Sequence, residues 1–262
     1  MDLFLSTELL ELRSAVRDFF SEIGSRSTVL NTVPSSCDAS SLAGMLSAEA
    51  VETVWNGLAR DGFLAAPVPK NLGGGGLGVL AAQVLVEACG RELSPLPVFE
   101  TVAFGILPLM LLGSAEAQRG LFRQIVTGSL RLSGSIELAY PASRRTMLGN
   151  PNEQNTGTDA AIMGDVHACI ADLDKAADFT HLLSGVSMLV PALDRVQALL
   201  IGARSDSVDG ENQSDHPGLF LVNMKGQPRK AVSVEQLPTL DRVRSYFVVN
   251  FKEARAVRIS RS

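Results

Sequence analysis

The sequence predicts an α+β protein, with an all-helical domain over residues 1–129 followed by a compact, barrel- or sandwich-like β domain over residues 130–262. A length of 262 residues favours two modest domains or one large one. The apolar residues follow helical spacing up to Gly128 and form short β-type runs after it. With 46% hydrophobic and 19% charged residues, the composition is that of a folded globular chain.

The helical domain is predicted to contain five helices. The first begins near Thr7, with Ser6 or Thr7 as its N-cap. The others are expected over Ser47–Asp61, Leu77–Gly90, Phe99–Leu112 and Ser114–Gly128. Glycine is expected to end each of the last three.

The β domain is predicted from short apolar runs that alternate with polar, glycine- and proline-containing turns. The expected strands include Leu130–Leu138, Ala198–Gly202, Leu219–Met224 and Tyr246–Phe251. The polar segment Pro141–Asp159 has neither helical nor strand periodicity, so we expect a loop there.

Charge and hydropathy exclude several classes of partner. A formal net charge of −5 and a pI of about 5.3 argue against a nucleic-acid partner. The longest apolar run, Val102–Leu112, is half of what a membrane span needs and contains Pro108, so no membrane segment is expected. The chain does not begin like a secretory signal, and we expect a cytoplasmic location.

The potential metal ligands and thiols are scattered along the chain. They are Cys37, Cys89, Cys169, His167, His181 and His216. Because their spacing fits neither a disulfide framework nor a zinc site, we expect free thiols and no metal.

The glycine run Gly73–Gly78 reads GGGGLG and satisfies the letters of the dinucleotide-binding pattern G-x-G-x-x-G. That pattern binds a pyrophosphate only where a buried strand leads into the turn. Here the preceding segment contains Pro67 and Pro69, which suit an extended loop, and no Lys-Ser or Lys-Thr pair follows. Two interpretations are open, a flexible loop that lets two helices pack closely and a dinucleotide site. We favour the loop.

Three consecutive stretches carry a family resemblance. They read WNGLARDGFLAAPVPKNLGGGGLG from Trp55, VLVEACGRELSPLPVFET from Val84 and LMLLGSAEAQRGLFRQIVTGSLRL from Leu109. In this order they resemble the N-terminal helical domain of acyl-CoA dehydrogenases and its connection into the middle β domain. The resemblance extends from about Thr7 to Val257 and is strongest before residue 132.

The β half resembles that family less closely. The stretch LLSGVSMLVPALDRVQALLIGAR is similar to a family strand pair, but Ser187 stands where the family has a lysine. Leu189, Val190 and Pro191 stand where it has a flavin-contacting Trp-x-Thr motif. Its Thr-Glu-Pro motif is replaced by SIELAYP around Glu137.

The resemblance implies a flavoprotein that uses FAD to form a trans-enoyl-CoA from an acyl-CoA thioester. In that family a carboxylate of a third, C-terminal helical domain removes the α-proton, and these 262 residues end before such a domain would begin. We therefore assign no catalytic residue and expect the isolated chain to be inactive. Glu87, Glu92 and Glu100 are interpreted as ordinary solvated carboxylates on helices.

The resemblance also implies which residues could line a site. Thr101, Phe104 and Leu107 lie on the helix that resembles the one lining the acyl pocket, although plain helix packing explains them equally well. The FAD contacts would come from Ser133, Ser135 and Glu137 on the strand beside the flavin and from Thr158 and Asp159 after the polar loop.

Three functions stay open at this point. The first is a partner subunit that associates with itself or with a homologous acyl-CoA dehydrogenase subunit. The second is a degenerate non-catalytic member acting as an interaction module. The third is an unrelated binding protein with the same fold. A yellow colour of the pure protein would favour the first.

Overall fold

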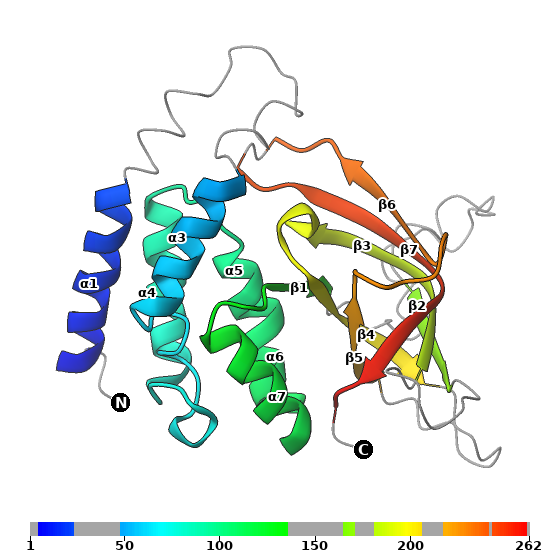
Figure 1. The fold of residues 1–262 in the computed structure, drawn as a ribbon, viewed down its shortest axis with the longest axis horizontal. Coiled ribbons are helices and arrows are strands. Elements are labelled where there is room, and N and C mark those ends of the chain that lie inside the picture. Colours follow the sequence, from blue (N-terminus) through cyan, green and yellow to red (C-terminus); the bar gives the residue numbers. More distant parts are fainter. Residues whose placement is uncertain are drawn as a thin grey trace, which may run out of the picture.

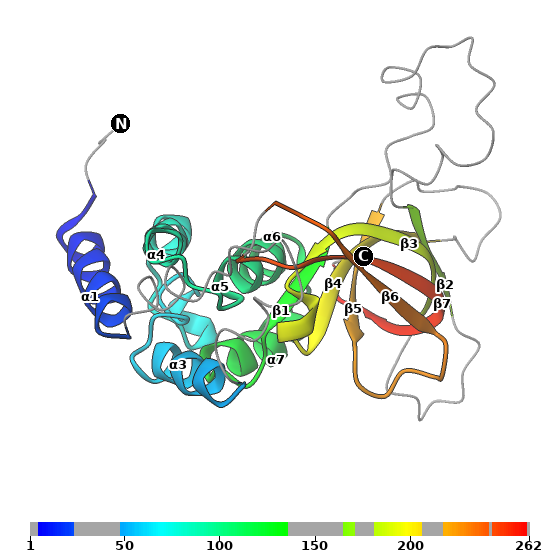
Figure 2. The same ribbon diagram turned by 90° about the horizontal axis from the view of Figure 1, so that it is seen from above.

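The computed structural model describes residues 5–23, 48–135, 165–170, 181–205, 217–240 and 243–260. Helices fill the N-terminal part and a curled, seven-stranded sheet the C-terminal part, which confirms the predicted α+β class (Figure 1). The helical segments are α1 (Thr7–Ile23), α3 (Ala48–Arg60), η2 (Lys70–Leu72), α4 (Gly78–Arg91), α5 (Val98–Glu100), η3 (Thr101–Ile106), α6 (Leu107–Leu112) and α7 (Ala115–Val126). Seen from above, α1 lies farthest from the sheet, and α5, α6 and α7 lie next to it (Figure 2).

The helices form where the sequence predicts them, with two differences. The predicted fourth helix is the continuous segment 98–112, made of α5, the π-helical η3 and α6; we call it the junction helix. Gly90 does not end its helix, because it lies inside α4, and the left-handed residue that follows is Leu93, with a φ of 50°. Ser114 caps α7 by accepting a hydrogen bond from the amide of Ala117.

The glycine-rich loop, residues 73–78, folds back on the segment that precedes it. The amides of Gly74, Gly75 and Gly76 donate to the carbonyls of Pro69, Ala65 and Val68, and the amide of Leu77 donates to that of Ala66. A Cβ at Gly74 would lie 2.0 Å from the Val68 carbonyl oxygen, so the two backbones touch. The geometry therefore agrees with a close-packed loop and leaves these amides unavailable to a phosphate.

The sheet curls until it closes on itself. Its strands are β1 (Leu132–Ser135), β2 (Asp165–Ile170), β3 (His181–Pro191), β4 (Ala198–Ser205), β5 (Pro217–Asn223), β6 (Val232–Leu237) and β7 (Tyr246–Arg258). The hydrogen-bonded order is β1-β4-β2-β3-β7-β5, and β5 also pairs with β4. Strand β1 runs parallel to β4, and β6 pairs antiparallel with the first half of β7, residues 246–251. The barrel-like prediction therefore describes the β half well.

The two halves share one apolar core. The main cluster joins side chains of the helices to strand residues such as Leu132, Leu200 and Leu219. A second cluster, with Val190, Phe220 and Val249, fills the inside of the curled sheet. Helices end at Val126 and strands begin at Leu132, but the predicted boundary between residues 129 and 130 is crossed by the main core.

Trp55 fastens the end of the helical half. Its indole is fully buried, and Nε1 donates to the carbonyl of Gly128 over 2.8 Å. The guanidinium of Arg131 lies 5.7 Å from the centre of the ring and pairs with Glu52 at 2.7 Å. This anchor fixes the point at which the chain leaves the helices and enters β1.

Among the described residues, no helix is both long and apolar enough to cross a bilayer. The same part of the chain contains no cluster of three or more His, Cys, Asp or Glu side chains that could hold a metal ion. Burial raises the pKa of the Cys89 thiol far above its usual range, so this sulfur is an unreactive core group.

Candidate functional site

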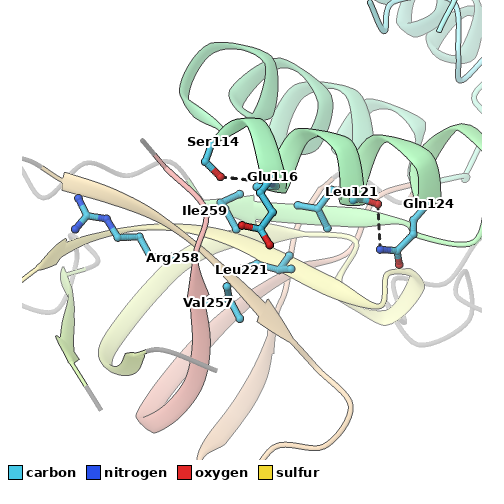
Figure 3. A pocket seen from close by; sticks show the side chains of 10 residues that line it. Ser114, Glu116, Leu121, Gln124, Leu221, Val257, Arg258 and Ile259 are labelled. Atoms are coloured by element: carbon cyan, nitrogen blue, oxygen red, sulfur yellow. Dashed lines mark hydrogen bonds between the residues drawn. The ribbon is translucent and has the colours of Figure 1, made fainter. Parts of the chain in front are cut away.

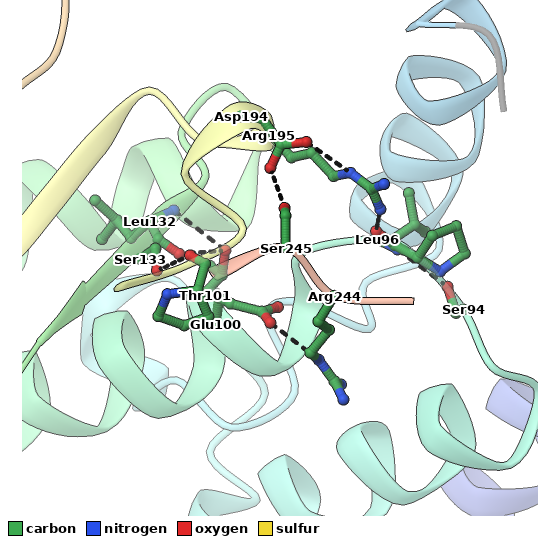
Figure 4. A network of polar contacts seen from close by, with 12 residues as sticks. Ser94, Leu96, Glu100, Thr101, Leu132, Ser133, Asp194, Arg195, Arg244 and Ser245 are labelled. Atoms are coloured by element: carbon green, nitrogen blue, oxygen red, sulfur yellow. Dashed lines mark hydrogen bonds and ion pairs between the residues drawn. The ribbon is translucent and has the colours of Figure 1, made fainter. Parts of the chain in front are cut away.

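Two of the predicted site residues, Thr101 and Ser133, lie where the junction helix meets β1 (Figure 4). The hydroxyl of Thr101 donates to the carbonyl of Leu132 and accepts from its amide, both over 3.2 Å. At Gly105 a Cβ would lie 3.1 Å from the Leu132 side chain, so glycine allows the strand to lie close to the helix. A π-helical turn at this contact is a feature often found at functional sites.

The three predicted pocket residues differ in what they expose. Thr101 is fully buried, and its hydroxyl is occupied by Leu132. Phe104 is partly exposed and meets Phe99 edge to face, with ring centres 5.9 Å apart. Leu107 is partly buried against the main core. Of the three, Phe104 and Leu107 retain surface for a ligand.

The predicted flavin contacts are only partly within the described residues. Ser133 is fully buried on β1, and its hydroxyl donates to the carbonyl of Pro191 over 2.5 Å. Ser135, two residues on, is also buried. Glu137, Thr158 and Asp159 lie outside the described residues.

Strand β3 is irregular where the resembling family has its flavin-contacting motif. The register against β7 shifts between Ser187 and Val190. Leu189 takes a left-handed conformation with a φ of 53° and is 57% exposed, whereas Val190 is fully buried. The buried hydroxyl of Ser187 has no hydrogen-bond partner in the structure. This bulge therefore presents an apolar side chain outward and holds an unsatisfied hydroxyl inside.

These groups do not by themselves form a flavin site. A bound flavin needs accessible hydrogen-bond donors, but the hydroxyl of Ser133 is used within the protein and Ser135 is buried. The described part of β1 also pairs along its length with β4. The hydroxyl groups of these two serines are therefore not accessible to a cofactor.

Glu100 is not the solvated carboxylate that the sequence suggested. It is 1% exposed on the junction helix, and its Oε1 accepts from Nε of Arg244 over 3.1 Å. Its Oε2 is buried without a hydrogen-bond partner. Burial raises the pKa of Glu100, and the nearby positive charges of Arg244 and Arg195 oppose that shift. By contrast, Glu87 is exposed as predicted and pairs with Arg17 and Arg91.

Two arginines of the β half grip the segment around Glu100 (Figure 4). Arg244 also lies over the ring of Phe99, 5.1 Å from its centre, and Arg195 donates to the carbonyl of Pro95. The turns that carry the two arginines are joined, because Ser245 donates to Asp194 over 2.6 Å. We call Glu100, Arg195 and Arg244 the junction clamp.

A sequence signal for the clamp exists. Glu100 is the only charged residue between Leu93 and Gly113. The helix therefore has no charged face that would place Glu100 in solvent together with other charged residues. A lone carboxylate in an apolar segment is a reason to expect a buried partner. The sequence does not indicate that this partner is Arg244, which is 144 positions away.

A separate pocket of about 440 Å³ lies between α7 and the ends of β5 and β7 (Figure 3). It is lined by Ser114, Glu116, Ala117, Gly120, Leu121, Gln124, Leu221, Val257, Arg258 and Ile259. None of the predicted site residues is among them. Its walls are largely apolar, with Glu116 and Arg258 as the charged groups, and the Ser114 hydroxyl is used as the N-cap of α7.

The clamp has no open route to a substrate among the described residues. The Glu100 carboxyl is enclosed between the two halves, so we do not assign it as a base for bound substrate. What the arrangement does is hold a helix with partly exposed Phe104 and Leu107 against a strand.

Residues 6–129 match the family described as "Acyl-CoA dehydrogenase, N-terminal domain". A curated relative, acyl-CoA dehydrogenase FadE28 of Mycobacterium tuberculosis, is 34% identical over 76 residues, which are 29% of this chain and 22% of that protein. The chain thus aligns with less than a quarter of this relative's length.

Solved structures extend the likeness to the whole chain. A variant of the Tcur3481–Tcur3483 steroid ACAD is 27% identical, with a TM-score of 0.66, over 97% of this chain and 57% of that one. The ChsE4–ChsE5 complex of Mycobacterium tuberculosis has a TM-score of 0.63 and 21% identity, over 99% of this chain and 58% of that one. The chain therefore has the fold of a little over half of each neighbour.

Proposed function

Because residues 6–129 are an acyl-CoA dehydrogenase N-terminal domain and the whole chain has that family's fold, we propose that it is a partner subunit of an acyl-CoA dehydrogenase assembly. In this role it associates with a homologous subunit, or with a second copy of itself, and closes one side of a site for an acyl-CoA thioester. The catalytic base comes from residues other than those described.

The observation that carries this proposal is the pairing of a candidate binding wall with no accessible base among the described residues. The junction helix offers Phe104 and Leu107 beside a strand that also resembles the family's flavin strand. The one carboxylate at that place, Glu100, is enclosed and paired with Arg244. The neighbour at 27% identity carries two names, Tcur3481 and Tcur3483, and another is described as a complex of two proteins, which supports a heteromeric assembly.

In the proposed assembly, Thr101, Phe104 and Leu107 belong to the acyl-CoA wall, with Thr101 acting through its bonds to Leu132. Ser133 and Ser135 lie on the strand proposed to pass the flavin, and Glu137, Thr158 and Asp159, which lie outside the described residues, are proposed as further contacts to FAD. Bound FAD would supply the hydride acceptor. Because the hydroxyl of Ser133 is occupied and Ser135 is buried, we place the tight contacts to FAD on the partner rather than on these serines.

Co-expression tests the proposal directly. The 262-residue chain is produced alone and together with acyl-CoA dehydrogenase subunits encoded near it, and both products are purified through a tag on this chain. Because the tight contacts to FAD are placed on the partner, we expect the chain alone to be colourless and inactive in a dye-linked assay with added FAD, so the yellow colour that would mark a partner subunit should belong to the complex. The complex should be yellow and should oxidise at least one member of an acyl-CoA panel that includes a steroid side-chain thioester. Turnover by the chain alone, or failure to retain any subunit, would contradict the proposal.

One observation favours a second function, that of a non-catalytic interaction module. Leu189, Val190 and Pro191 stand at the family's Trp-x-Thr positions. The carbonyl of Pro191 accepts a hydrogen bond from the hydroxyl of Ser133. A complex that forms but carries no flavin and shows no turnover would support this alternative over the first.

A further inference from the structure

The junction clamp connects the two halves through charged groups and hydrogen bonds as well as through apolar packing. Arg244 reaches Glu100 with its Nε and covers Phe99 with its guanidinium face. Arg195 holds the Pro95 carbonyl, five residues before Glu100. Both arginines belong to the β half, and these contacts reach Pro95, Phe99 and Glu100, at or just before the start of the junction helix. The helix is therefore held at its N-terminal end by charge and at Thr101 by hydrogen bonds.

We propose that Arg244, acting through Glu100, is a positioning residue that sets the junction helix, and with it Phe104 and Leu107, against β1. This deepens the proposed function and rests on it for what the helix contacts, an acyl-CoA thioester. The positioning itself depends only on the contacts within this chain. Phe104 lies one helical turn beyond Glu100, so a shift at the clamp moves its ring directly.

The burial of the Glu100 carboxyl makes the position of the junction helix depend on Arg244. Among the described residues Glu100 Oε2 is buried with no hydrogen-bond partner, and the carboxylate is compensated by its own backbone amide and by Arg244, whose Nε donates to Oε1. Removing one partner of a buried pair leaves the other as an uncompensated charge, which is far more costly than loss of an exposed pair. The groups that face Glu100 are Arg244, Arg195 on the short 3₁₀ helix η5 (Leu193–Arg195) and Cys89 on α4, and burial keeps the Cys89 thiol neutral. Protonation of Glu100 is therefore the available way to relieve the loss of Arg244.

Hydrogen exchange of the whole chain tests the inference without any ligand. In R244M, we expect amides of the junction helix to exchange about a hundredfold faster at neutral pH, because the helix opens to hydrate Glu100. After correction for intrinsic exchange, this excess should shrink as the pH is lowered and Glu100 becomes protonated. R244K should restore part of the protection, since lysine keeps the charge but cannot cover Phe99 in the same way.

The double variant E100Q/R244M is the control that distinguishes an unpaired buried charge from general misfolding of R244M. It removes the carboxylate together with its partner, and we expect protection of the junction helix within about threefold of wild type. R91M is the matched control, because Arg91 pairs with an exposed carboxylate, Glu87, on the neighbouring α4. It should leave exchange of residues 98–112 unchanged.

The inference is wrong if R244M accelerates exchange equally in α1, the junction helix and the sheet, or if its effect does not vary with pH. It is equally wrong if E100Q/R244M is no better protected than R244M. A complex that fails to bind acyl-CoA while this exchange pattern holds would overturn the proposed function and leave the positioning role intact.

Discussion

The glycine-rich loop, for which the sequence favoured a packing role, and the junction clamp, for which it predicted none, use their polar groups in opposite ways. GGGGLG has the letters of a phosphate-binding motif, yet the amides of Gly74, Gly75 and Gly76 are all bonded to carbonyls of the preceding turn. Glu100 has no motif at all, yet its carboxyl is 1% exposed and has one oxygen without a partner. A polar group can act on a ligand or a neighbour only if its hydrogen-bonding capacity is not already used.

This comparison assigns different roles to the two regions. The loop is a structural connection between α3 and α4 that depends on the absence of side chains. The clamp is an electrostatic connection between the helices and the sheet, with charges on both sides. Substitutions in the loop should act through shape, and substitutions in the clamp through charge and pH.

The largest effect is expected for R244M, which leaves the Glu100 carboxylate buried without its donor. The free energy of unfolding should fall by about 3–5 kcal/mol, the usual result of breaking a buried pair. Urea unfolding followed by circular dichroism measures it. E100Q/R244M should recover most of the loss, and a double variant as unstable as R244M would show that packing of Arg244 on Phe99 matters more than charge.

A smaller loss is expected for G74A in the loop. The added Cβ would lie 2.0 Å from the Val68 carbonyl oxygen, so the backbone must shift at a cost of about 1–3 kcal/mol. The matched control is G120A on α7, where nothing lies within 4 Å and alanine should stabilise the helix by about 0.5–1 kcal/mol. Thermal unfolding compares the two, and an unchanged G74A would mean that the loop is loose rather than close-packed.

E100Q separates charge from shape within the clamp. Burial raises the pKa of Glu100, so the folded state holds this proton more tightly than the unfolded state. Its contribution to stability is present below the unfolded pKa and is lost as the pH rises through the folded pKa. The stability of E100Q relative to wild type should therefore increase with pH over that window in urea unfolding. A difference that stays constant with pH would show that Glu100 does not titrate there.

The smallest effect is expected at the exposed pair on α4. R91M removes a partner of Glu87 in an exposed i,i+4 pair and should cost no more than about 0.5 kcal/mol. The Glu87 pKa is lowered by Arg91 and Arg17, so the small contribution should disappear as the pH falls through it. A loss comparable with that of R244M would remove the contrast between exposed and buried pairs.

The helices were predictable because their apolar faces repeat locally, and the bounds of α3 and α7 differ from the prediction by at most two residues. Strand β6 was not, because its central residues are exposed and leave no alternating apolar pattern. The π-helical turn at Thr101–Ile106 also has no sequence signature, since it depends on the contact with Leu132. Glu100 was misjudged for the same reason: its burial is decided by Arg244, from the far end of the sequence.

Trp55 is the single tryptophan of the chain, and its indole is fully buried against the carbonyl of Gly128. Any separation of the helices from the first strand would bring that ring into contact with water. Its fluorescence would then shift to longer wavelength, without interference from another indole. The molecule thus contains its own optical reporter at the seam between its two halves, and opening of that seam in the isolated chain can be followed there without a label.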